Sequence, residues 1–125
     1  MRKITLLFSF LILSISIYGQ SPESFNFQAV IRNVNNTIVS NKNIGIQFRI
    51  IQGSSSGMVI YSETHATKTD VYGLVALQVG MGNTIFDEDN FASIDWSKGL
   101  FFLEIAADIS NNSVYKILGT QQLMS

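Results

Sequence analysis

Apolar and polar residues alternate along most of the chain after residue 24, which is the pattern of half-buried β-strands. In residues 25–32 the apolar side chains share one face, with Asn26, Gln28 and Arg32 on the other. Residues 44–50 alternate in the same way, with three isoleucines and Phe48 facing inward. The same reasoning predicts strands over residues 37–40, 58–68, 74–79, 100–109 and 114–123.

Turn-forming residues separate these strands about every ten positions, and the chain shows no amphipathic helical pattern. The predicted turns are residues 33–36, 41–43, 53–57, 70–73, 97–99 and 110–113. Residues 80–93 break the alternation, and Asp87–Phe91 predicts one helical turn with acids at its start. About seven short strands of this kind predict an all-β fold, an antiparallel β-sandwich of immunoglobulin-like type.

The core and the exposed faces follow from the same pattern. We expect Phe48, Leu77, Phe102 and Leu103 in the core. Residues 100–109 are almost wholly apolar, which predicts a central strand with a neighbour on each side. In residues 58–68 the polar positions are expected on the more solvent-exposed face; they are Tyr61, Glu63, His65 and Thr67. Gly119, inside the last strand, predicts a β-bulge.

The amino terminus follows a different pattern. A short basic start precedes a 15-residue apolar run that ends at Tyr18. The run is shorter than the roughly 20 residues of a membrane-spanning helix. Residues 1–19 are therefore predicted to be a secretory signal peptide, cleaved after Gly19 or Gln20, with no membrane span left afterwards. Residues 20–125 then form a single exported domain, extracellular, on the outer surface or in the periplasm.

Composition narrows the partners of this exported domain. Without Arg2 and Lys3, six basic and nine acidic residues remain, a net charge of −3. Nucleic acids and anionic membrane surfaces both require a basic face, so this balance argues against them. The chain has no cysteine, so no disulfide supports the domain.

Catalytic chemistry is not indicated. His65 is the only histidine, and a triad would need Asp70 and a serine, but no Gly-x-Ser-x-Gly elbow is present. Glu63 and Glu104 would have to flank a cleft to act as a glycosidase pair, and so small a sandwich leaves little room for one. We expect no catalytic residue and no cofactor.

Two binding chemistries have candidate residues. Asp87, Asp89 and Asp95 form an acidic patch suited to calcium, although the EF-hand spacing is missing and a solvated acidic turn explains it equally. Trp96 with Tyr61 and Tyr72 would offer a stacking platform for a sugar. The alternative is that Trp96 plugs one end of the sandwich.

Six ordered blocks resemble a known N-terminal domain of exported surface proteins from Bacteroidota-type bacteria. Residues 25–33, FNFQAVIRN, resemble its opening FNYQAVVRN. The other blocks resemble its FSILQG, YSETH, FGLF, IDWGSG and MGTQQL segments, at residues 48–53, 61–65, 72–75, 94–99 and 118–123. Residues 70–77 also resemble transthyretin-like modules. The family continues past its last strand with VPYA, whereas this sequence ends at Ser125.

The resemblance implies a β-sandwich, immunoglobulin-like or transthyretin-like, without catalytic residues to carry over. We expect a non-enzymatic exported module of structural or adhesion type, with a protein or glycan at the cell surface as partner. Its exposed edge strands are expected to pair with another chain. The alternative function is a carbohydrate-binding module that uses Trp96 and nearby tyrosines.

Overall fold

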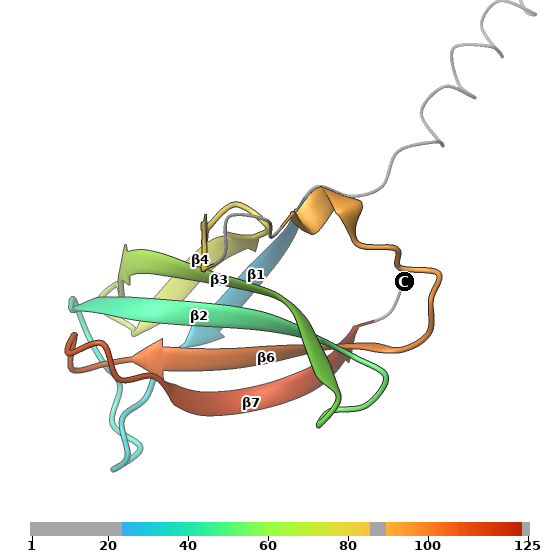
Figure 1. Ribbon diagram of the computed structural model, residues 1–125. Helices are drawn as coiled ribbons and strands as arrows, with labels where there is room; N and C mark the ends of the chain where they lie inside the picture. The colour runs from blue at the N-terminus through green and yellow to red at the C-terminus, as the bar shows by residue number, and fades with distance from the viewer. Residues whose placement is uncertain (1–23, 86–89, 124–125) are drawn as a thin grey trace, which may run out of the picture.

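The computed structural model describes residues 24–85 and 90–123, which form two antiparallel β-sheets packed face to face (Figure 1). In chain order the elements are β1 (Phe25–Val30), β2 (Asn43–Gln52), β3 (Met58–Lys68), β4 (Leu74–Val79), β5 (Asn83–Thr84), the 3₁₀-helix η1 (Phe91–Ser93), β6 (Phe101–Asp108) and β7 (Lys116–Leu123). The predicted all-β antiparallel sandwich of about seven strands is confirmed. No helix in these residues has the length and apolar character needed to span a bilayer.

One sheet has two strands, β1 and β4, and the other has five in the order β5-β3-β2-β6-β7. The strong alternation of β2 places it in the middle of the larger sheet, between β3 and β6. β6 lies between β2 and β7, as its two-sided apolar pattern predicts. The free edges of the larger sheet are therefore β7 and the two-residue β5.

One predicted strand was wrong, and one strand of the structure was not predicted. Residues 37–40 form only an isolated bridge, Arg32 with Ile38, because the Asn33 side chain accepts the N–H groups of two following residues and folds the segment into a turn. β5 was not predicted, since two residues carry no periodic signal. Most of the predicted helical turn, residues 87–89, lies outside the described residues; the described part has a 3₁₀-helix from Phe91, capped by the Asn90 side chain, which accepts the N–H of Ala92.

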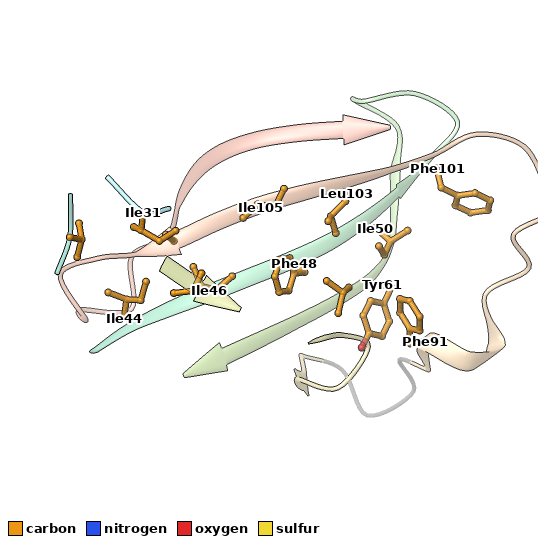
Figure 2. Packing of buried hydrophobic residues seen from close by; sticks show 14 residues of the cluster. Ile31, Ile44, Ile46, Phe48, Ile50, Tyr61, Phe91, Phe101, Leu103 and Ile105 are labelled. Carbon is orange, nitrogen blue, oxygen red and sulfur yellow. The ribbon is translucent and has the colours of Figure 1, made fainter. Parts of the chain in front are cut away.

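The core lies between the sheets, and the inward isoleucines of β2 line up along it (Figure 2). Phe48 and Leu103 are fully buried, as predicted, and Leu77 packs against the cluster while partly buried. The placement of Phe102 in the core was wrong. It lies between two core residues of β6, Phe101 and Leu103, so strand alternation turns it to the outer face.

The expected solvent-exposed face of β3 was also wrong. Tyr61 is 2% exposed and Glu63 is 0% exposed. The register pairs Tyr61 with Ile50 and Glu63 with Phe48. Directly opposed residues of an antiparallel pair share one face, so this polar set lies on the core side together with the isoleucines of β2.

Three connections gather at one end of the sandwich, opposite the end where β1 begins and β7 finishes (Figure 1). We call them the distal end: residues 31–42, 69–73 and 109–115. The N–H of Ile31 donates to the carbonyl of Gly73 (2.8 Å), and the N–H of Asn41 to the carbonyl of Asp70 (3.0 Å). Gly73 has φ +80°, and a Cβ there would come within 2.6 Å of Ile38, so only glycine allows this close packing.

Candidate functional site

The most unusual polar feature is the buried carboxylate of Glu63 on β3. It accepts hydrogen bonds from the hydroxyl of Tyr61 (2.5 Å) and from the N–H groups of Gly80 (2.7 Å) and Gly82 (3.2 Å). Nε2 of His65 contacts its second oxygen. A buried carboxylate is tolerated only when its oxygens are hydrogen-bonded, and these four groups meet that need.

The loop Gly80–Gly82 approaches this carboxylate closely because it carries no side chain at the contact point. A Cβ on Gly82 would lie 2.6 Å from Nε2 of His65 and 2.8 Å from Oε2 of Glu63. The loop follows β4 of the small sheet directly and leads into β5, which pairs with β3 at Glu63. Glu63 therefore anchors the loop that connects β4 of the small sheet to β5 of the larger sheet.

His65 is the fourth group in contact with the Glu63 carboxylate, and it also packs against the core. Its side chain is only 11% exposed, and its ring stands edge-on to Phe48 with centroids 5.4 Å apart. Sequence reasoning missed the cluster because Glu63 and His65 are polar residues on an otherwise alternating strand. The available signal was the Gly-x-Gly at residues 80–82, which permits close backbone approach to a neighbouring group.

The other catalytic candidates are dispersed. Glu104 lies on the outer face of the larger sheet, where it pairs with Arg49 at 3.0 Å, whereas Glu63 points to the core. The two carboxylates are thus on opposite faces and cannot flank one substrate. Asp70 accepts the N–H groups of Tyr72 (2.8 Å) and Leu74 (2.9 Å) in the β3–β4 turn, while His65 contacts Glu63.

Of the proposed calcium ligands, Asp87 and Asp89 lie outside the described residues. Asp95 accepts the hydroxyl (2.5 Å) and the N–H (3.1 Å) of Ser97. These two hydrogen bonds hold the pKa of the Asp95 carboxyl below its ordinary value. Across residues 24–85 and 90–123, no three His, Asp or Glu side chains are grouped to hold a metal ion.

The three aromatic candidates for sugar stacking do not meet on one surface. Trp96 stands edge-on to Phe91 and Phe101, with centroids 5.6 and 5.0 Å apart, so it packs against one end of the core. Tyr61 is buried beside Phe91, as Figure 2 shows. Tyr72 is 72% exposed but lies in the β3–β4 turn of the distal end. This geometry agrees with the alternative interpretation, in which Trp96 plugs the sandwich.

A polar hollow of about 280 Å³ lies close to that aromatic end. Gln52, Asn90, Asp95 and Lys98 contribute polar side chains to its lining, and Phe101 contributes an apolar one. Trp96 does not line it, although its indole N–H is buried without a hydrogen-bond partner. The ring that lines the hollow, Phe101, is only 3% exposed, so it offers little surface for sugar stacking.

On the outer face, Tyr115 from the β6–β7 connection reaches across to β2. A Cβ on Gly45 would lie 2.7 Å from its hydroxyl oxygen, so glycine makes room for the ring. Burial raises the pKa of the Tyr115 phenol, and the negative charge of Asp108 adds to the shift. Asp108 itself accepts the N–H groups of Asn112 (3.0 Å) and Ser113 (2.7 Å), which fixes the hairpin.

Comparison with known proteins gives one match. A family model described as "Domain of unknown function (DUF8740)" matches residues 26–120, a segment that begins in β1 and ends in β7. No curated protein and no solved structure matches the chain. Because the family model covers most of the chain and every strand of both sheets, the protein belongs to the DUF8740 family.

Proposed function

We propose that this protein is a non-enzymatic exported module of structural or adhesion type that joins other chains by strand addition at the free edge of β7. The observation that carries the proposal is this edge. β7 has 8 residues, and among the described strands it pairs only with β6. On the opposite edge, β5 pairs with Glu63 and Thr64 of β3, so only residues 58–62 and 65–68 of β3 lie outside this pairing, each stretch shorter than β7.

The side chains of β7 suit an association edge. Ile117 and Leu118 are 63% and 46% exposed, and Lys116 at the start of the strand is its only charged residue. Edge strands that avoid pairing usually carry proline or several charges. β7 contains neither, and its one irregularity is the bulge at Leu118, next to Gly119 where the sequence predicts one, so the regular stretch offered for pairing is residues 119–123.

A second copy of the chain is the partner that fits this edge most simply. When two β7 strands pair antiparallel about a two-fold axis, Lys116 at the start of one strand lies opposite the end of the other, near Gln122. No like charges face each other in that arrangement. The product is a continuous sheet through both copies, which suits a structural or adhesive role.

The saturated polar groups support a non-enzymatic role. Among the described acidic residues, Glu63 is enclosed by four donors, Glu104 pairs with Arg49, and Asp70, Asp95 and Asp108 accept bonds from nearby turns. Carbohydrate binding through Trp96 has less support, because neighbouring rings enclose the indole.

Export is tested by expressing the full coding sequence and fractionating the cells. We expect the protein outside the cytoplasm with a new amino terminus at Gln20 or Ser21, as a signal peptide requires. Intact-mass measurement reads the terminus. Cytoplasmic protein that retains Met1 would refute the exported location.

The edge is tested by placing two charges on it. We expect the Ile117→Lys/Leu118→Lys variant to weaken self-association at least about tenfold, because buried lysines oppose strand pairing. Sedimentation velocity over a concentration series gives the dissociation constant. Met58→Lys, which charges an exposed apolar residue at the start of β3, away from β7, is the control. A monomer at every concentration, or equal weakening by the control, would contradict pairing at β7.

A further inference from the structure

The distal end exposes more large apolar side chains than a solvated loop region requires. Val34 is 85% exposed and Tyr72 is 72% exposed, and neither takes part in the core cluster. Other exposed apolar residues at or next to the distal end are Val30, Ile38, Val71 and Val114. Several exposed apolar side chains at one end of a fold are typical of an interaction surface.

The same end is basic, although the whole exported domain is acidic. Four of the six basic residues beyond residue 19 lie at or next to it: Arg32, Lys42, Lys68 and Lys116. Within the described part of the chain none of the four forms an ion pair. The acids of this end are Asp70 and Asp108, so four basic and two acidic side chains give it a formal charge of +2.

A hollow of about 260 Å³ opens between the β1–β2 connection and the β6–β7 hairpin. Val34, Ile109 and Val114 contribute apolar side chains to its lining, and Lys116 contributes a cation. Apolar lining combined with one cation suits an amphiphile that carries a negative headgroup.

We propose that the distal end docks on an anionic lipid surface. Val34, Val71, Tyr72 and Val114 enter the headgroup region, and the four basic side chains face the lipid phosphates. The net charge of −3 argued against anionic membranes, but it averages over the whole domain, whereas screening limits electrostatic attraction to charges within about 8–10 Å of the lipid surface. The two surfaces share Lys116, the first residue of β7, but the other residues of the docking surface lie outside that strand, so this proposal does not depend on strand pairing.

The observations favour lipid over a protein partner. The apolar residues come from three different loops rather than from one flat face or groove. A lipid headgroup layer is soft and accommodates several separate side chains. A folded protein partner would need a surface of complementary shape. Aliphatic and tyrosine side chains surrounded by Lys and Arg are the composition of proteins that bind at the membrane interface.

Flotation of the exported, purified protein with lipid vesicles tests the proposal. We expect binding to phosphatidylcholine vesicles that contain roughly one part in three of phosphatidylglycerol, and little binding to pure phosphatidylcholine. The Lys42→Gln/Lys116→Gln variant should bind on the order of tenfold more weakly, and Lys98→Gln should bind normally. Val34→Ser/Tyr72→Ser should also weaken binding, with Met58→Ser as its matched control.

The substituted side chains are exposed, so thermal unfolding should be nearly unchanged in each variant, which separates binding from folding. Absence of binding to anionic vesicles would overturn the proposal. Equal losses of vesicle binding in Lys98→Gln and Lys42→Gln/Lys116→Gln would also overturn it, because binding would then not depend on the distal end. Binding to soluble polyglutamate in preference to the vesicles would indicate an acidic protein partner instead of lipid.

Discussion

Replacement of Glu63 by glutamine is expected to lower the free energy of unfolding by about 3–5 kcal/mol, the range for breaking a buried charged pair. Glutamine keeps the shape of the side chain but substitutes an NH₂ group for one oxygen. That group would face either the hydroxyl of Tyr61 and the N–H of Gly80, which share one oxygen, or the N–H of Gly82, which donates to the other. At least one buried donor loses its acceptor, and the crossover between the sheets loosens.

Urea unfolding followed by the fluorescence of Trp96, the single tryptophan, measures this loss. Glu104→Gln is the matched control, because it makes the same chemical change on the outer face, where the partner Arg49 is 38% exposed. The Glu104 side chain is only 11% exposed, but Arg49 is reached by water when the pair is broken, so we expect that control to lose clearly less stability than Glu63→Gln. Similar losses in the two variants would show that the Glu63 carboxylate does not fasten the crossover.

Replacement of Phe48 by alanine is expected to destabilise the protein by about 3–5 kcal/mol, as for other fully buried phenylalanines. The ring is 0% exposed and stands edge-on to Phe27 of the small sheet, with centroids 5.0 Å apart. It also contacts the ring of His65 on β3. Its removal leaves a cavity at the point where the two sheets meet.

Phe102→Ala is the matched control for this cavity. Phe102 is partly exposed and faces away from the core, so the same truncation removes less buried surface. We expect a clearly smaller loss of stability, measured by the same urea titration. A larger loss for Phe102→Ala than for Phe48→Ala would mean that the inner and outer faces of the sheet have been exchanged.

Alternation and turn residues were enough to predict most strands. β3 and β4 begin and end where the sequence pattern places them, because Gly57 and the Asp70–Gly73 turn bound them with turn-forming residues. In residues 100–109 alternation is absent, so the pattern could not separate Phe101 from Phe102. Only the pairing with β2 determines which of them reaches the core.

The polar cluster and the basic end could not be predicted from local pattern. The pattern of β3 alone predicts a solvent-exposed Glu63. The backbone N–H groups that donate to its carboxylate lie 17 and 19 residues further along the chain. Likewise, Arg32, Lys68 and Lys116 are far apart in sequence, and the strand order brings them to one end. Net charge averages over this arrangement and conceals it.

Hydrogen–deuterium exchange of the β7 amides tests the proposed role most directly. In an antiparallel pair about half of the N–H groups of an edge strand point away from its neighbour. If the protein works through this edge, those amides of β7 gain protection as protein concentration rises, and Ile117→Lys/Leu118→Lys abolishes the gain. Protection of β7 that stays the same at every concentration would contradict the account.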